Sequence, residues 1–235
     1  MHFYEEEVSP ILEYGLVLSL RVAERLSVVD LGCGDGRLLF ALHKKGLLNE
    51  GDEIVGVDIS TTRIRRLESN LPFVRGIVSD ASNVKELPNS SFDFVICSQL
   101  IEHVEDDEAL VLEIKRLLKN GGLAYLSSVI KKRYGVYFYF RDGSFKLDPT
   151  HIREYRSADE FVGLITSKGF QPICVKTHPV LFPLSDMVIR LLIRFGLIKP
   201  NPNFFQKHKV LGKVRRIKVP IVGYESIEVL VRKVG

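Results

Sequence analysis

Short apolar runs alternate with stretches of helical periodicity along this chain. Each run is rich in Val, Ile or Phe, as buried strands are, and between the early runs apolar residues recur three and four positions apart. The expected strands cover residues 28–31, 53–58, 73–79, 92–98, 124–129, 170–177 and 224–234. Strands that alternate with helices predict an α/β fold with a doubly wound, mostly parallel, seven-stranded sheet.

A glycine-rich turn links the first strand to the first helix of this alternation. It contains Gly32, Gly34 and Gly36, which tolerate backbone angles that other residues avoid and let a ligand approach the main chain. Such a turn places unpaired helix amides at the carboxyl end of a parallel sheet, where these folds bind ligands. A dinucleotide fingerprint needs its third glycine at position 37, which is Arg37 here. The turn alone therefore predicts a nucleotide-type ligand and leaves its identity open.

Acidic residues stand at the ends of the first three strands. They are Asp30, Asp58 and Asp80. A carboxylate offers only acceptors, so it can take two hydroxyl donors at once. The string Asp30-x-Gly32-x-Gly34-x-Gly36 resembles motif I of the class I S-adenosylmethionine (SAM) methyltransferases, and Asp58 and Asp80 stand at that family's next two landmarks.

The resemblance implies that SAM is the cofactor and that the last strand lies antiparallel beside strand six. It further implies that Asp58 binds both ribose hydroxyls, and that Asp80 accepts from the adenine amino group while the backbone amide that follows donates to the ring. The expected cofactor-binding residues are Asp30, Gly32, Cys33, Gly34, Asp58, Ile59, Asp80, Ala81, Ser98 and Gln99.

The segment after strand four resembles the "Glu-His-Val" methyltransferases related to ubiquinone biosynthesis O-methyltransferases. It reads Gln99-Leu100-Ile101-Glu102-His103-Val104. Some of those proteins are thought to bind a divalent metal through Glu-x-x-Glu-His, whereas this chain has Gln99 at the first position. One carboxylate and one imidazole are a thin ligand set for a hard cation. We therefore expect no tightly held metal, and His103 is interpreted as a structural histidine.

His151 is the candidate catalytic base. The segment His151-Ile152-Arg153-Glu154-Tyr155 resembles the "His-x-Arg-Glu-Tyr" segment found after strand five in many small-molecule methyltransferases. Histidine titrates near neutrality, and a base assists methyl transfer where the acceptor is a hydroxyl or a protonated amine. A histidine that anchors the loop is the alternative, because the sequence identifies no second member of a dyad.

Basic charge is concentrated near the C-terminus. Residues 181–235 contain 11 Lys/Arg and 3 Asp/Glu, a net +8, while residues 1–180 carry −4 of the overall +4. An anionic partner or a solvated basic surface would both explain this. The three cysteines are scattered, which argues against a disulfide framework, and no targeting or spanning segment is evident. We therefore expect a cytoplasmic protein.

Residues 181–223 interrupt the expected final hairpin. The run Met187–Ile198 is apolar except for Arg190 and Arg194, and a basic stretch follows it. We expect one methyltransferase domain over residues 1–235 whose insert 181–223 caps the acceptor site and touches an anionic membrane surface. Packing against the domain or a second subunit is an alternative, so the protein is expected to be a monomer or a homodimer. Nucleic acid is disfavoured, because the insert's aromatic residues are not interleaved with its basic ones.

The expected activity is methyl transfer from SAM to oxygen or nitrogen of a small-molecule or lipid-like acceptor. The aromatic segment 134–145 favours that acceptor class. One alternative is a catalytically inactive SAM-fold protein that uses its basic tail on nucleic acid. Another is a nicotinamide-dependent oxidoreductase, which Arg37 and the lack of a second nucleotide-binding half disfavour.

Overall fold

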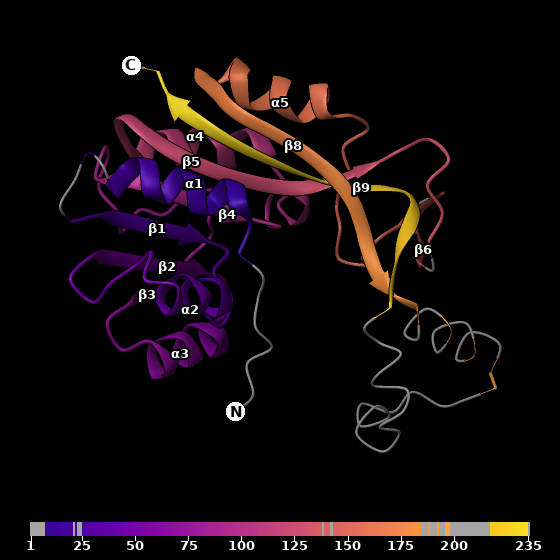
Figure 1. Ribbon diagram of the computed structural model, residues 1–235, viewed down its shortest axis with the longest axis horizontal. Helices are drawn as coiled ribbons and strands as arrows, with labels where there is room; N and C mark the ends of the chain where they lie inside the picture. Colours follow the sequence, from indigo (N-terminus) through magenta and orange to yellow (C-terminus); the bar gives the residue numbers. More distant parts are fainter. Residues whose placement is uncertain are drawn as a thin grey trace.

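The computed structural model describes residues 8–20, 22, 25–137, 139–141, 143–184, 188, 192, 196, 197 and 217–234. Its centre is a seven-stranded sheet in the order β3-β2-β1-β4-β5-β9-β8 (Figure 1). The strands are β1 (Ser27–Leu31), β2 (Glu53–Asp58), β3 (Arg75–Val78), β4 (Phe92–Ser98), β5 (Leu118–Lys131), β8 (Phe170–Pro183) and β9 (Lys218–Lys233).

The sheet has the predicted architecture. Strands β1 to β5 are parallel, and β9 lies antiparallel between β5 and β8. The chain builds outward from β1 to β3 and then returns to place β4 on the other side of β1. Such a reversal opens a crevice at the carboxyl ends of the two central strands, where ligands bind in doubly wound sheets. The expected α/β fold with an antiparallel last strand is confirmed.

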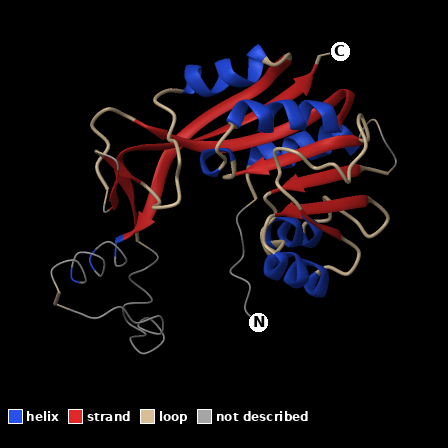
Figure 2. Ribbon diagram, turned by 180° about the vertical axis from the view of Figure 1, so that it is seen from behind, coloured by secondary structure: helices blue, strands red, loops and turns tan. Residues whose placement is uncertain are grey.

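Helices cover both faces of the sheet (Figure 2). Helices α1 (Pro10–Leu20), α2 (Arg37–Lys44) and α3 (Thr61–Asn70) share one buried apolar cluster, and α4 (Asp107–Leu117) and α5 (Ala158–Ser167) contribute to the other. Side chains fix three of the helix starts: Ser60, Asp106 and Ser157 each accept a hydrogen bond from a backbone amide of the first turn. Burial on both faces explains why the central strands are nearly continuous apolar runs.

The C-terminal strands are longer than the sequence pattern indicates. β8 continues to Pro183 and β9 begins at Lys218, with Leu181 paired to Pro220. Most β8 side chains are exposed, so hydrophobic alternation does not mark the extra length, and backbone pairing alone extends it. A hairpin of β6 (Tyr139–Arg141) and β7 (Ser144–Lys146) also follows β5. The far ends of β8 and β9 project beyond the rest of the sheet (Figure 1).

The predicted insert 181–223 falls mostly outside the described residues. Only its ends, which belong to β8 and β9, and the isolated positions 184, 188, 192, 196, 197 and 217 are described. The expected cap and its apolar run therefore stay predictions. Among the helices that the structure describes, none is long and apolar enough to cross a membrane.

Candidate active site

The glycine turn stands at the carboxyl end of β1. Gly32, Gly34 and Gly36 have φ angles of 75°, 58° and 83°, in the left-handed region that side chains disfavour. A Cβ atom on Gly32 would lie 2.8 Å from Leu100 Cδ1, whereas one on Gly34 would meet nothing within 4 Å. The backbone at Gly34 thus faces open space, which is the room that a ligand needs to approach it.

Asp58 ties this turn to the end of β2. Its Oδ2 accepts a hydrogen bond from the Gly34 amide at 3.0 Å, and its Oδ1 accepts from the Ser60 amide at 2.8 Å. Arg63 Nη1 lies 3.5 Å from Oδ2. Each carboxylate oxygen has a second lone pair, so the group can still accept from ligand hydroxyls. Asp58 therefore shapes the turn and remains able to take the predicted ribose contact.

The next predicted cofactor residues along the chain are Ile59, Asp80 and Ala81, which follow β2 and β3. Ile59 follows Asp58 directly and is 78% exposed, which is unusual for isoleucine at the end of a buried strand. At the end of β3, exposed Asp80 accepts from the Ser82 amide at 2.8 Å, and Ala81 is buried. The Ser79 amide reaches the Asp58 carbonyl oxygen, so these two strand ends are neighbours. Exposed Ile59 and Asp80 therefore stand at the ends of two neighbouring strands.

Cys33 and Asp30 lie beneath the turn and are almost fully buried. Burial raises the pKa of the Cys33 thiol, and the nearby Asp30 and Asp58 carboxylates raise it further. The thiol is therefore protonated and is not a nucleophile. The Cys33 backbone amide donates to the Val57 carbonyl oxygen at 3.0 Å, which ties the turn to β2.

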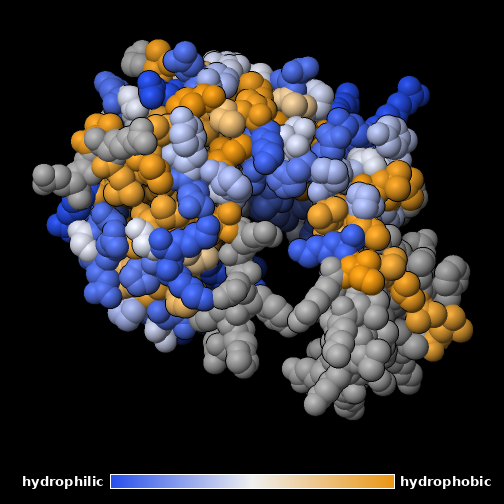
Figure 3. Space-filling model, viewed as in Figure 1, coloured by the Kyte–Doolittle hydropathy of each residue, from blue (hydrophilic) through white to orange (hydrophobic). Residues whose placement is uncertain are grey.

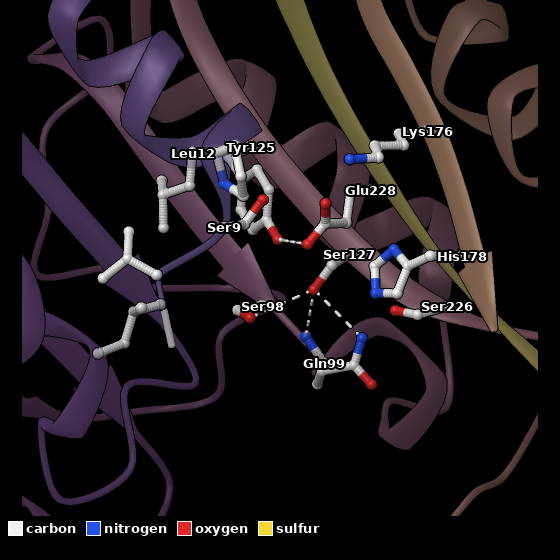
Figure 4. Close-up of a pocket in the computed structure, with 13 residues that line it drawn as sticks. Ser9, Leu12, Ser98, Gln99, Tyr125, Ser127, Lys176, His178, Ser226 and Glu228 are labelled. Carbon is white, nitrogen blue, oxygen red and sulfur yellow. Dashed lines mark hydrogen bonds between the residues drawn. The ribbon is translucent and has the colours of Figure 1, made fainter. Parts of the chain in front are cut away.

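Gln99 follows β4 in a strained conformation. Its φ is 50°, in the left-handed region that few residues other than glycine adopt, and such strain is concentrated at functional sites. The Ser127 hydroxyl lies between Ser98 and both the backbone and the side chain of Gln99 (Figure 4). With its amide nitrogen toward Glu102, Gln99 donates to Oε1 at 3.2 Å and accepts from the Ser128 amide at 3.3 Å. Gln99 lines two neighbouring cavities, described next.

The first cavity, of about 440 Å³, lies against the sheet face at the start of α1 (Figure 4). Strand pairing aligns Ser127, Glu228 and Lys176 across β5, β9 and β8. Tyr125 Oη donates to Glu228 Oε1 at 3.0 Å, and burial, followed by the Glu228 charge, raises the pKa of Tyr125. Because α1 begins at Pro10, it leaves this polar part of the sheet uncovered. No local sequence pattern indicates this cavity, because its walls come from strands that are neighbours only in the folded chain.

The second cavity, of about 330 Å³, holds His151. The His151 Nδ1 lies 3.0 Å from Glu154 Oε1, and that oxygen also accepts from the Leu147 amide at 2.7 Å. Both side chains are buried. A neutral imidazole that donates its Nδ1 proton to Glu154 keeps Nε2 unprotonated, which is the form of a general base. Glu154 is thus the hydrogen-bond partner of His151 that the sequence did not identify.

Glu102 holds the His151 segment in place. The Ile152 amide donates to the Glu102 carbonyl oxygen at 2.9 Å, and Tyr155 pairs with the end of β5 at Ile130. The Glu102 carboxylate is fully buried and accepts from Ser128 Oγ at 2.9 Å. Burial raises the pKa of Glu102, although its hydrogen bonds and the nearby His103 and His151 oppose that shift. One buried residue thereby joins the end of β4 to the loop after β5.

Glu102, His103 and His151 also bring three ligand atoms within 4.8 Å of one another. From the sequence we expected no tightly held metal, because only Glu102 and His103 are neighbours along the chain. The fold brings His151 next to them. One carboxylate and two imidazoles are poor ligands for Mg²⁺ or Ca²⁺ but are types that transition metals accept. His103 Nδ1 already lies 3.1 Å from Thr150 Oγ1. The absence of a tight metal stays a prediction.

Comparisons with known proteins agree on one family. A family described as "Methyltransferase domain" matches residues 29–126. The ubiquinone biosynthesis O-methyltransferase of Paracidovorax citrulli is 29% identical over 123 residues, covering 52% of this chain and 51% of that protein. The protein of the same name from Pseudomonas paraeruginosa is 30% identical over 103 residues and covers 44% of each chain. The chain thus spans about half the length of the curated relatives it matches.

Solved structures share the fold. A SAM-dependent methyltransferase from Methanosarcina mazei superimposes with a TM-score of 0.63 at 17% identity, covering 97% of this chain and 99% of that one. The cyclase SpnF superimposes with a TM-score of 0.59 at 17% identity, covering 94% and 82%. Because a protein named as a cyclase shares this fold, the arrangement of the site must carry the argument about chemistry.

Proposed function

We propose that the chain is a class I SAM-dependent methyltransferase that moves the SAM methyl group to oxygen or nitrogen of a small-molecule or lipid-like acceptor. The observation that carries this proposal is the His151–Glu154 pair, whose histidine lines a cavity that reaches the carboxyl end of β4 at Gln99. A side chain that can accept a proton lies near the carboxyl end of β4, where we expect SAM to bind. Such a side chain suits a methyl acceptor that loses a proton when it is methylated.

The strand ends fit SAM. The open backbone at Gly34, the exposed Ile59 and the acceptor groups of Asp58 and Asp80 offer complementary contacts for the amino-acid, adenine and ribose parts of the cofactor. When bound, SAM supplies a methyl group already activated on a sulfonium. The residues that we assign to it are Asp30, Gly32, Cys33, Gly34, Asp58, Ile59, Asp80, Ala81, Ser98 and Gln99.

This chain's own residues then orient the acceptor and move its proton. His151 Nε2 accepts the proton of the acceptor hydroxyl or ammonium, and Glu154 holds the imidazole in the required tautomer. Apolar walls exclude water, so that positioning contributes much of the rate. Those walls are Val129, Tyr137, Leu147, Val180, Phe182 and Ile221.

The same walls support the acceptor class. Six apolar side chains in one small cavity suit an aromatic or aliphatic group better than a folded macromolecule. The relatives named for ubiquinone biosynthesis act, by that name, in O-methylation, which favours oxygen as the acceptor atom here.

The direct test is product formation from methyl-labelled SAM. We would offer catechol, a simple primary amine and a lipid extract, and follow the label by mass spectrometry. Label in a small or lipid-extractable product, lost in His151→Ala, supports the proposal. SAM binding with label only in added RNA, or with no labelled product from acceptor-rich extracts, would contradict it and favour the inactive or nucleic-acid-binding alternative.

Chelation is expected to leave turnover unchanged. The Glu102 carboxylate is fully buried and hydrogen-bonded to Ser128 and Gln99, and Gln99 stands where a second carboxylate ligand would be needed. The measurement is turnover before and after EDTA, with the metal content of the purified protein determined in parallel. Activity that falls with EDTA and returns with added magnesium or zinc would show that the three-residue cluster holds a metal.

We further propose that the insert 181–223 caps this cavity and touches an anionic membrane surface. Val180, Phe182 and Ile221, at or near its ends, line the cavity, and residues 181–235 carry +8. Each lysine or arginine near such a surface contributes about 1 kcal/mol to binding.

Vesicle flotation checks this proposal. We expect the protein to float with phosphatidylglycerol vesicles and not with phosphatidylcholine vesicles, and to lose that binding when Lys213, Arg215 and Arg216 become glutamine. A protein that does not float, and whose dimer in solution dissociates on Leu191→Glu, would instead identify the apolar run as a subunit interface.

A further inference from the structure

A cavity of about 540 Å³ lies beside the end of β5 and belongs to neither cavity described above. We propose that it binds a multivalent oxyanion, namely a phosphate or diphosphate group. Its lining residues are Lys131, Lys132, Arg133, Lys146, Arg156 and Glu154. Five side chains are cationic and only one is anionic. This cavity shares Glu154 with the proposed His151–Glu154 pair, but binding of an anion here requires neither SAM nor methyl transfer.

One acidic residue, Glu154, lines this cavity. Its side chain is buried; Oε1 is engaged by the Leu147 amide and by His151 Nδ1, whereas Oε2 has no hydrogen-bond partner among the described residues. Lys132 pairs with Glu225 at 2.9 Å. Apart from Glu154, the described lining contains no carboxylate. Arg133, Lys146 and Arg156 still outnumber the single lining carboxylate, and the resulting positive potential favours the binding of an anion.

The backbone that carries the cations is firmly held. The Lys131 amide donates to the Tyr155 carbonyl oxygen at 2.7 Å, and the Lys132 amide donates to the Gly223 carbonyl oxygen at 2.8 Å. Gly223 has a φ of 76°, and a Cβ atom there would lie 2.4 Å from the Gly135 Cα. The two backbones touch, so the turn after β5 cannot open without breaking this packing. A rigid backbone lowers the entropic cost of holding several cationic side chains around one ligand.

The mixture of lysine and arginine favours phosphate. Arginine presents a planar fork that binds two phosphate oxygens, and lysine adds a compact charge. None of the six lining residues is aromatic, so the cavity offers no stacking platform for the bases of a nucleic acid. The shared chemistry is therefore an oxyanion with two or more charges, which either a soluble phosphate compound or a lipid headgroup supplies.

Calorimetric titration of the full-length protein with sodium pyrophosphate and with sodium phosphate tests the proposal. We expect saturable binding at about 10 mM ionic strength, where screening is weak, and tighter binding of pyrophosphate. Arg133→Gln combined with Arg156→Gln should weaken pyrophosphate binding by about tenfold or more, because each change removes a charge-assisted hydrogen bond. Both arginines are exposed, so the double variant should fold normally.

Two matched controls separate this cavity from other basic surfaces. Arg65 and Arg66 on α3 line a different surface cavity, and changing both to glutamine removes the same charge. Changing Lys213, Arg215 and Arg216 to glutamine removes charge from the C-terminal basic segment. Neither control should alter pyrophosphate affinity by more than about twofold. A wild type that shows no saturable binding, or a loss of affinity equal in all three variants, would overturn the proposal.

Phosphatidylglycerol vesicles distinguish the two sources of the anion. If free pyrophosphate displaces the protein from these vesicles, and Arg133→Gln/Arg156→Gln weakens flotation, the cavity takes a lipid headgroup. If pyrophosphate binds and flotation is unaffected, the cavity takes a soluble phosphate compound. Both outcomes support an oxyanion site. Since no readout requires SAM or turnover, a failure here is distinguishable from a failure of the proposed methyl transfer.

Discussion

Replacing His151 by alanine should lower turnover by about 10²- to 10⁴-fold and leave SAM affinity unchanged, because that is the range expected for a lost general base. The structure places His151 in the cavity that meets β4 at Gln99, with Nδ1 at 3.0 Å from Glu154 Oε1. Single-turnover rates with saturating SAM, alongside calorimetric titration of SAM, measure the two quantities separately.

Glu154→Gln refines this prediction. Glutamine can still accept from the His151 Nδ1–H but lacks the charge that stabilises an imidazolium, so turnover should fall less than in His151→Ala, with a shifted pH profile. His43→Gln is a suitable control, because His43 contacts Leu48 and Phe73 on another part of the molecule. If His151→Ala instead weakens SAM binding while the rate of the bound complex holds, His151 anchors the loop and the base assignment is wrong.

Asp58→Ala should weaken the binding of SAM and of its demethylated product by a similar factor of about 10- to 100-fold. A charge-assisted hydrogen bond contributes about 1.5–3 kcal/mol, and a ribose contact does not sense whether the methyl group is present. Calorimetric titration of both ligands gives the two factors.

Asp58 also accepts from the Gly34 and Ser60 amides, so its loss disturbs the turn as well. Thermal unfolding of the variant shows whether the fold survives, and Glu53→Gln, at the opposite and exposed end of β2, is the matched control. Unchanged affinity for both ligands in a folded Asp58→Ala protein would remove Asp58 from the ribose site. A loss confined to SAM would move Asp58 toward the methyl group instead.

One of the hydrophobic clusters among the described residues lies beside the His151 cavity. Hydrophilic residues lie above the hollow between the body of the sheet and the far ends of β8 and β9, while apolar side chains are exposed over α1 (Figure 3). Tyr137, Ile221 and Tyr224 form a small separate cluster with Val129 beside the His151 cavity. That cluster gives the His151 cavity an apolar wall although most β8 side chains are exposed.

Features whose causes lie within a few neighbouring residues can be predicted from the sequence. The positions of the first five strands along the chain follow from apolar runs, and the turn after β1 follows from glycines that adopt positive φ angles. The helix starts at Ser60 and Ser157 follow from side chains that reach amides only three residues away. The positions of Asp58 and Asp80 at the sheet's carboxyl edge follow from the parallel arrangement, because parallel strands end on the same side.

The contacts between residues far apart in the sequence depend instead on how the elements pack. His151 joins Glu102 and His103 because backbone hydrogen bonds hold its loop against Glu102 and the end of β5. The lengths of β8 and β9 depend on pairing between two mostly exposed edges, which leaves no hydrophobic period to read. The basic cavity likewise gathers residues from three segments. Local patterns specify elements because their causes lie within a few residues, whereas sites depend on packing between elements, which no local pattern records.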